Sequence, residues 1–322
     1  MIYTINDNFG LKIAYIFNIS YFICPTMLSN YRTFQDIYQQ SDVLKDLHQT
    51  YKQIEATDYA GSIYSQRYDN QISIHIESCN SSMLQSGVTP LNEVCLGFML
   101  EQHQPCMING LHIEPKQVIL FSPNANFDTR FNGLTTFMLV SFPSNLFKEE
   151  LENNHLKTIK NISLESISPL LLTSLYSEFN HDSLDIFSNS ILLNEIIFKI
   201  KFQLSHIEIM RKNYRNQYDV YCKFKHWLFT NINKKICIKS ASYDIGVSRR
   251  NLEFCCKAIT GLSPQKYIYI VRLNAIRKIL KSGSNQKITE IAYDWSFDHL
   301  GRFSHDYKNL FGELPSKTIR HV

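Results

Sequence analysis

The chain has 322 residues, about two domains by usual domain sizes, and 44% of its residues are hydrophobic, which is enough to build real cores. This is the composition of a globular protein and excludes a chain that is disordered throughout. Residues 214–322 hold 19 Lys and Arg against 8 Asp and Glu, a net charge of +11, whereas residues 1–213 hold 14 against 21, a net charge of −7. Such asymmetry favours a nucleic acid or an anionic membrane as partner of the basic part; a solvated basic face without a partner is the alternative.

The first 26 residues are apolar and aromatic, but they fit no targeting segment. They lack a basic beginning, and Asp7 and Lys12 interrupt the apolar run, which excludes a signal peptide and a membrane span. A cytoplasmic protein is therefore expected. Because amphipathic patterning starts only after Met27, we hypothesise that translation begins there and treat residues 1–32 as an N-terminal extension. Detection of a native peptide that begins at Met1 would rule this out.

The cysteines show no spacing typical of a metal or redox site. No two of the eight are separated by two residues, and Cys255 and Cys256 are adjacent, which is poor geometry for one ordinary bridge. We predict reduced, mostly buried thiols, with a redox switch as the alternative.

Residues 33–155 alternate between short strand-like segments and turns. After a polar segment, Asp42–Lys52, that is compatible with a helix, many short strands at close spacing predict a small β-barrel or sandwich, cupin-like in form. The strand-like segments are residues 62–68, 72–77, 94–100, 118–121 and 137–142.

A metal-dependent enzyme of the cupin type is one alternative function for such a β-rich domain. Its available ligands, His75, His103 and His112, stand far apart, with no His-x-His pair and no carboxylate at ligand spacing. Phosphate-binding glycine motifs and nucleophile arrangements are also missing from the sequence. We therefore expect no enzyme activity, no metal and no other cofactor.

Residues 156–213 change to a helical period. Apolar residues recur at helical spacing in residues 170–176 and 191–200, which predicts a linker of two amphipathic helices. Their apolar faces pack either on the β-rich domain or on a second copy of the chain in a homodimer.

The basic region, residues 214–322, contains an internal repeat. Ile238–Gly246 aligns with Ile288–Ser296 at an offset of 50, and Gly261–Pro264 aligns with Gly312–Pro315 at an offset of 51. Two copies are too few for a solenoid and instead predict a duplicated unit of a short helix, a tight turn and a longer helix. This is the form of a helix-turn-helix, whose second helix enters the DNA major groove.

The first longer helix follows Gly246 and is capped by Ser248. Leu252, the cysteine pair and Ile259 form its inward stripe. The residues expected to face DNA are Ser248, Arg249, Arg250, Phe254 and Lys257.

The second longer helix repeats this arrangement with Asp298 as its cap. Its inward stripe is Leu300, Phe303, Tyr307 and Leu310, and its outward residues are His299, Arg302, Ser304, His305 and Asn309. Residues 264–281 form a spacer helix of roughly 27 Å. Since one turn of B-DNA is roughly 34 Å, two longer helices held by this spacer would reach successive major grooves.

These segments resemble the AraC/XylS type of bacterial transcription regulators over about residues 218–321. The resemblance rests on Gly246–Leu252, on Thr260–Pro264 followed by Arg272–Arg277, and on Trp295–Ser316. His-Leu-Gly before the second longer helix and Arg-Leu-Asn-Ala in the spacer look most like the ethanolamine-utilisation regulators. Small amines and alcohols are therefore effectors to test, although the effector itself stays unknown.

The resemblance implies an α+β protein with an effector-sensing β-rich domain, a helical linker and an all-α DNA-binding domain with two helix-turn-helix units. It further implies an effector-responsive activator that binds promoter DNA and works with RNA polymerase. The reading positions of the family fall on Arg250, Phe254, Gly301, Arg302 and His305. Phe254 departs from the usual polar reader and Gly301 offers no side chain, so base recognition is expected to be sparse and DNA shape more important. An architectural DNA-binding protein without an effector is the remaining alternative.

Overall fold

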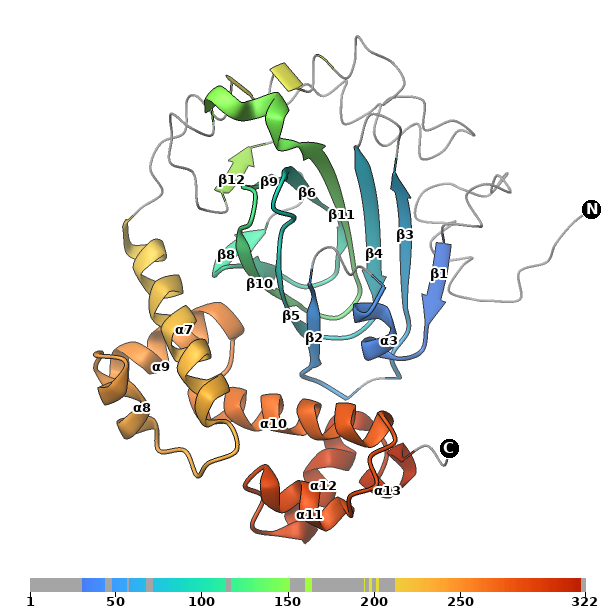
Figure 1. Cartoon of the computed structure of the whole chain (residues 1–322), viewed down its shortest axis with the longest axis vertical. Helices are drawn as coiled ribbons and strands as arrows, with labels where there is room; N and C mark the ends of the chain where they lie inside the picture. Colours follow the sequence, from blue (N-terminus) through green and yellow to red (C-terminus); the bar gives the residue numbers. More distant parts are fainter. Residues whose placement is uncertain are drawn as a thin grey trace, which may run out of the picture.

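The computed structural model describes residues 31–43, 48–56, 58–67, 72–113, 117–150, 160–163 and 212–319, together with residues 194, 197, 198, 201 and 202. A β-rich region and a helical region lie against each other (Figure 1). No helix in the described ranges is long and apolar enough to cross a membrane. The two predicted linker helices and the Met27 hypothesis fall almost entirely outside the described residues.

Seven strands form one antiparallel sheet in the order β1-β3-β4-β11-β6-β9-β12. The five strand-like segments of the sequence are all confirmed, and all of them belong to this sheet. Its strands are β1 (Tyr31–Phe34), β3 (Gly61–Arg67), β4 (Ser73–Cys79), β6 (Glu93–Gln102), β9 (Gln117–Phe121), β11 (Thr135–Pro143) and β12 (Lys160–Ser163).

Five further strands form a second antiparallel sheet in the order β2-β5-β10-β7-β8. The helix expected within Asp42–Lys52 is wrong there, because α3 spans Ile37–Ser41 and Thr50–Gln53 is strand β2, paired with β5. The other strands of this sheet are β5 (Met83–Val88), β7 (Cys106–Ile108), β8 (Leu111–Ile113) and β10 (Asn126–Phe131).

The two sheets share one apolar core. Met83 and Phe131 of the five-stranded sheet are buried in it with Ile63, Met99 and Phe121 of the seven-stranded sheet. Closure into a barrel requires hydrogen bonds between edge strands. Among the described strands no pair joins one sheet to the other. The β-rich region is therefore a pair of facing sheets, which confirms the sandwich of the two predicted forms and makes the barrel wrong.

The helical region confirms the repeat seen in the sequence. The helices are α7 (Lys212–Asn231), α8 (Ile238–Asp244), α9 (Arg249–Thr260), α10 (Pro264–Lys281), α11 (Ile288–Asp294), α12 (Leu300–Phe311) and α13 (Pro315–Thr318). The first residues of the two longer helices, α9 and α12, are 51 positions apart in the sequence, and so are their last residues. The two short helices, α8 and α11, are offset by 50 positions, as in the sequence alignment.

The helix ends follow the sequence signals, with one exception. The Ser248 hydroxyl accepts a hydrogen bond from the amide of Asn251 and caps α9, as predicted. Gly261 and Gly312 end α9 and α12 with φ of 70° and 74°, a left-handed conformation that favours glycine. The predicted cap Asp298 is wrong: His299 is the N-cap of α12, without a side-chain bond, and the Asp298 carboxylate instead lies 3.6 Å from Lys235 Nζ.

The cysteines of the described ranges are all free thiols, and the cysteine pair is buried. Cys255 and Cys256 are 1% and 0% exposed, which confirms that they are core residues of α9. Burial raises the pKa of the Cys256 thiol to about 12, so it is protonated at neutral pH.

Replacing Cys255 with serine is expected to lower the free energy of unfolding by about 1–3 kcal/mol, because a hydroxyl replaces an apolar thiol in the core. Urea unfolding measures this loss. The preferred DNA sequence should not change, and an altered preference in a fully folded variant would contradict the core assignment.

Candidate nucleic-acid interface

Helix α9 presents its leading end to solvent directly after a tight turn. Gly246, with φ of 72°, and Val247 connect it to α8. Arg249 and Arg250 are both exposed at its first turn. The Nε atom of Arg249 donates to Glu253 at 2.8 Å, whereas Arg250 makes no hydrogen bond or ion pair with any described residue.

The two faces of α9 separate as the sequence predicted. Leu252 and Ile259 are buried with the cysteine pair, whereas Phe254 is 59% exposed and Lys257 is also exposed. Phe254 therefore lies on the solvent side of the helix, where the sequence analysis expected it to face DNA.

Helix α12 has the equivalent arrangement. Phe303, Tyr307 and Leu310 are buried, Leu300 is half-buried, and the predicted outward residues His299, Arg302 and His305 are exposed. Ser304, also predicted to face outward, is half-buried. The side chain of Arg302 is 80% exposed and lies 3.6 Å from Asp306, and the amide of Asn309 lies 2.8 Å from His305 Nε2.

Helix α10 fixes the two longer helices relative to each other. Its 18 residues span roughly 27 Å. Its C-terminal half is joined to the α12 unit by Arg277, whose guanidinium lies 2.9 Å from Glu313 and 4.5 Å from the centre of the Phe311 ring. Near its middle, Arg272 donates to the carbonyl oxygen of Ile232 at 2.9 Å, in the segment that follows α7.

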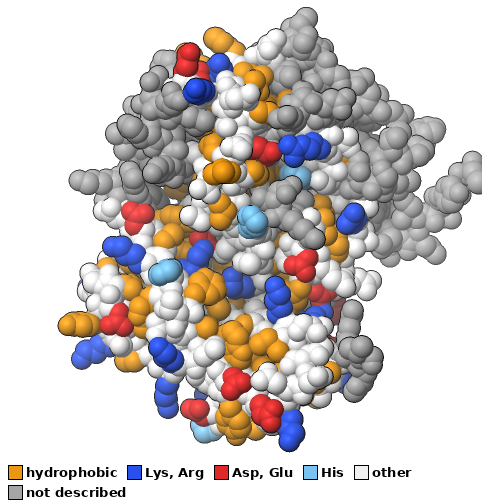
Figure 2. Space-filling view, viewed as in Figure 1, with side chains coloured by type: hydrophobic (Ala, Val, Ile, Leu, Met, Phe, Trp, Pro, Cys, Tyr) orange, Lys and Arg blue, Asp and Glu red, His pale blue; other side chains and the backbone are white. Residues whose placement is uncertain are grey.

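Two exposed tyrosines beside these helices were not among the residues that the sequence analysis expected to face DNA. Tyr243 on α8 is 86% exposed and Tyr293 on α11 is 55% exposed. They are the tyrosines of the repeated Tyr-Asp pair, which the sequence showed only as a sign of duplication. Lys and Arg side chains lie over the helical region in the lower half of Figure 2, among some acidic ones.

The β-rich region holds the helical region through its five-stranded sheet. Asn274 of α10 donates to the carbonyl of Gln53 at 3.0 Å and accepts from the Gln53 amide at 2.9 Å. Ile54 and Leu84, although they belong to the β-rich region, are buried in the core of the helical region.

A buried carboxylate forms the second link. Asp128 of β10, 4% exposed, accepts from Lys225 Nζ of α7 at 2.7 and 2.9 Å and from the Tyr218 hydroxyl at 2.9 Å. The Ser86 hydroxyl donates to it from within the sheet at 2.7 Å. Asp128 thus joins the sheet to the first helix of the helical region.

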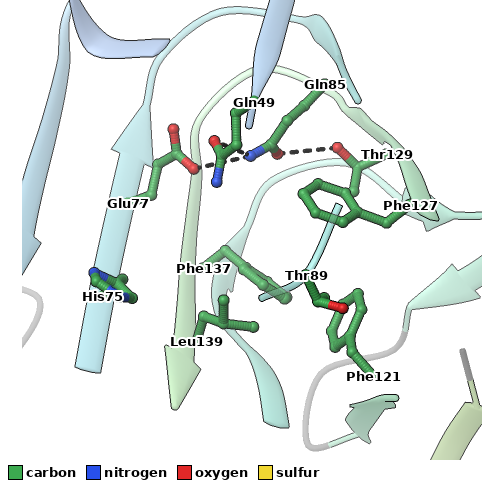
Figure 3. A pocket seen from close by; sticks show the side chains of 10 residues that line it. All are labelled: Gln49, His75, Glu77, Gln85, Thr89, Phe121, Phe127, Thr129, Phe137 and Leu139. Atoms are coloured by element: carbon green, nitrogen blue, oxygen red, sulfur yellow. Dashed lines mark hydrogen bonds between the residues drawn. The ribbon is translucent and has the colours of Figure 1, made fainter. Parts of the chain in front are cut away.

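A small cavity lies on the other side of this sheet, inside the β-rich region (Figure 3). Glu77, Gln49, Gln85 and Thr129 form its polar end. The other lining residues are His75, Thr89, Phe121, Phe127, Phe137 and Leu139. At about 30 Å³ the cavity holds one or two water molecules.

The three histidines of the cupin alternative do not come together. His75 lies on β4 beside the Ser65 hydroxyl, His103 is exposed near Glu101, and His112 is exposed on β8. Within the described ranges no three His, Cys, Asp or Glu side chains are grouped so that they would hold a metal ion.

The comparisons with known proteins concern the helical region. Residues 242–321 match the family model described as a helix-turn-helix domain. Over 92 residues the chain is 38% identical to the XylDLEGF operon transcriptional activator of Pseudomonas putida, and these aligned residues are 28% of this chain and 29% of the activator. Over 98 residues it is 32% identical to a probable thc operon regulatory protein of Rhodococcus erythropolis, and these aligned residues are 30% of each chain.

Among solved structures, the AraC-like transcriptional activator CuxR aligns with 76% of this chain and 93% of its own, at 11% identity and a TM-score of 0.43. The chain spans about 30% of the length of the two curated relatives named above. Residues 242–321 are thus a helix-turn-helix domain similar to those of AraC/XylS-type transcriptional activators.

Proposed function

We propose that this protein is a sequence-specific DNA-binding transcription regulator that inserts α9 and α12 into successive major grooves of one DNA face. The observation that carries the proposal is the pair of equivalent helices, each with its inner face buried and its leading end exposed, joined by one α-helix. The length of α10, roughly 27 Å, is compatible with helices placed about one turn of B-DNA apart, roughly 34 Å.

Within this interface the arginines are the principal base readers. Arg250 and Arg302 are exposed and present planar donors that suit guanine or a phosphate. His305 is a base reader of the second helix, and Phe254 presses on a thymine methyl group. The remaining contacts are assigned to the DNA backbone, through Ser248, Arg249, Lys257, His299 and Ser304, with Tyr243 and Tyr293 added from the structure.

Selection of bound fragments from random duplex DNA by the full-length protein tests this function. We expect an enriched site with two short elements about 10 base pairs apart. A variant with Arg250→Ala and Arg302→Ala serves as the control and should enrich much less. Salt-sensitive binding without any enrichment would show phosphate attraction alone and contradict sequence-specific recognition.

Replacing Arg250 with alanine is expected to cost about 1–3 kcal/mol on the preferred site and less on random DNA, because a bidentate contact to a base is lost. Titration of both DNAs at one salt concentration measures the difference. Arg249→Ala is the matched control, because the guanidinium of Arg249 is hydrogen-bonded to Glu253 and is assigned to the DNA backbone and not to a base. An equal loss on both DNAs would make Arg250 a phosphate contact.

The proposal extends to the whole chain as an effector-responsive activator. In it, residues 33–155 sense a small molecule, residues 156–213 link or dimerise, and residues 214–322 bind promoter DNA and engage RNA polymerase in a bacterial cytoplasm, without enzyme activity. The five-stranded sheet supports sensing, since one face lines a cavity and the other holds the DNA-binding helices. The likeness to ethanolamine-utilisation regulators is part of this proposal and rests on the sequence motifs alone.

A further inference from the structure

Glu77 is the charged group of the cavity between the two sheets. Its side chain comes from the middle of the seven-stranded sheet, on β4, and the residue is 6% exposed. In Figure 3 it stands at one end of a polar row that continues through Gln49 and Gln85 to Thr129, with the rings of Phe127 and Phe137 on the apolar side. The cavity therefore has one anionic end and aromatic walls.

The partners of this carboxylate are all neutral. Its Oε1 atom accepts from Gln40 Nε2 at 3.0 Å and from the Tyr51 hydroxyl, and its Oε2 atom accepts from Gln85 Nε2 at 3.2 Å. No Lys or Arg forms an ion pair with it among the residues that the structure describes. Burial raises the pKa of Glu77, and the three donors offset that rise only in part.

A buried carboxylate without a cation is costly, and proteins normally pair such a charge. Asp128, on the outer face of the five-stranded sheet, is paired in this way by Lys225. Glu77 has the same degree of burial but meets only amides and a phenol. Neutral donors supply no counter-charge for the ionised form of Glu77, so burial raises the pKa of this group, and a bound cation would favour its ionised form.

We propose that this cavity binds a small organic cation, a primary ammonium ion with a short apolar body, and that Glu77 supplies the counter-charge. The proposal rests on the proposed function, in which the β-rich region senses an effector, and it names the chemical class of that effector. An ammonium group has three donors, which suit the two carboxylate oxygens of Glu77 and the hydroxyl oxygen of Thr129. The rings of Phe121, Phe127 and Phe137 suit the apolar body, and an aromatic face also attracts a cation.

Gln49 occupies the position that a ligand needs. Its Oε1 atom accepts from Gln85 Nε2 at 2.7 Å and lies 2.5 Å from the Tyr51 hydroxyl, whose single proton faces both this oxygen and Glu77, so the Gln49 carboxamide lies across the polar end of the cavity. Because the space left is about 30 Å³, a compound larger than one or two waters enters only when this side chain moves away. Gln49 is therefore a plug that a ligand displaces.

Movement of this plug reaches the DNA-binding region directly. Gln49 immediately precedes β2, and four residues later Gln53 exchanges two hydrogen bonds with Asn274 of α10. Tyr51 lies between them and touches both Gln49 and Glu77. A ligand that displaces Gln49 thus acts on the strand that holds the spacer between the two recognition helices.

The test is binding of n-propylammonium to the full-length protein by isothermal titration calorimetry, with 1-propanol and propionate as neutral and anionic compounds of matched size. We expect the ammonium ion to bind and both matched compounds to bind at least tenfold more weakly. Equal binding of the alcohol, tighter binding of the acid, or no binding of the ammonium ion at concentrations up to tens of millimolar would overturn the proposal.

Three variants sharpen this result. Glu77→Gln keeps the shape and removes the charge, and it should weaken ammonium binding at least tenfold. Glu93→Gln, at the start of β6 and outside the cavity, should bind as the unaltered protein does. Gln49→Ala should bind more tightly because the plug is gone, and this outcome stays informative if Glu77→Gln does not fold.

Selection of DNA fragments on the same preparation, both with and without n-propylammonium, separates the two proposals. Enrichment of a DNA site without any ammonium binding would overturn the cation site alone. Ammonium binding by a protein that enriches no DNA site would leave the cation site in place and overturn the proposed function.

Discussion

Replacing Asp128 with alanine is expected to lower the free energy of unfolding by about 3–5 kcal/mol, because it leaves the Lys225 ammonium without its counter-charge in a mostly buried place. The side chains of Asp128 and Lys225 are 4% and 21% exposed, and the Nζ atom lies within 2.9 Å of both carboxylate oxygens. The Tyr218 and Ser86 hydroxyls lose their acceptor as well. Urea unfolding followed by tyrosine and tryptophan fluorescence measures the loss.

The double variant Asp128→Ala with Lys225→Met is the control. Removing both charges should recover most of the lost stability, since no unpaired ion then stays buried. A double variant as unstable as the single one would mean that packing at β10, and not the ion pair, stabilises this contact. Because the pair joins the β-rich region to α7, we also expect Asp128→Ala to change the affinity for the selected DNA site. Measuring the same affinity for the double variant shows whether the change comes from the unpaired Lys225 charge or from the lost contact between the two regions.

The strands that the sequence predicted show a clear local signal, which strand β2 lacks. Segments such as Ile72–Glu77 and Phe137–Phe142 show β-branched and aromatic residues in a short run, which is the standard strand signal. Strand β2 reads Thr-Tyr-Lys-Gln and looks like a polar surface segment, yet three of its four residues are buried. It is buried because a sheet covers one face and a helical domain the other, and no local pattern encodes that tertiary context.

The two longer helices were predicted well because they are repeated. The offset of about 50 residues placed α8, α9, α11 and α12, and the buried stripes follow helical spacing. The cap of α12 was predicted wrongly, because the helix begins one residue later than expected, with His299 as its N-cap and Asp298 outside it, 3.6 Å from Lys235 Nζ.

Neither the cavity nor the link between the β-rich and the helical region could be predicted from the sequence. Gln85 and Thr129 are polar and yet 4% exposed each, whereas sequence rules place such residues on the surface. Asp128 and Lys225 lie 97 residues apart, and neither belongs to a motif. Both features arise from the alternation of β10 and β5, which turns Phe127 and Met83 inward and Asp128 and Leu84 towards the helices.

Lys52 gives the second large prediction, because it is a buried cation at the boundary between the two regions. It is 8% exposed on β2, and burial, with a smaller effect of Lys225, lowers the pKa of its ammonium to about 8, while Asp128 acts in the opposite direction. The unfolded chain keeps a lysine pKa near 10.5 and therefore binds more protons than the folded protein between these two values. The resulting destabilisation is fully present below pH 8 and fades as the pH rises towards 10.5.

Lys52→Met should therefore stabilise the protein by up to about 3 kcal/mol at pH 7, as a pKa depression of this size converts at about 1.4 kcal/mol per unit. Urea unfolding at pH 7, 8, 9 and 10 should show this advantage shrinking from pH 8 upward. Buried tyrosines such as Tyr51, whose pKa is raised by burial, lower the stability of both proteins near pH 10, so the quantity to compare is the difference between them. Lys223→Met, at an exposed position of α7, should show almost no difference at any pH. An advantage that stayed constant across this range would mean that Lys52 is charged throughout and that methionine stabilises by packing alone.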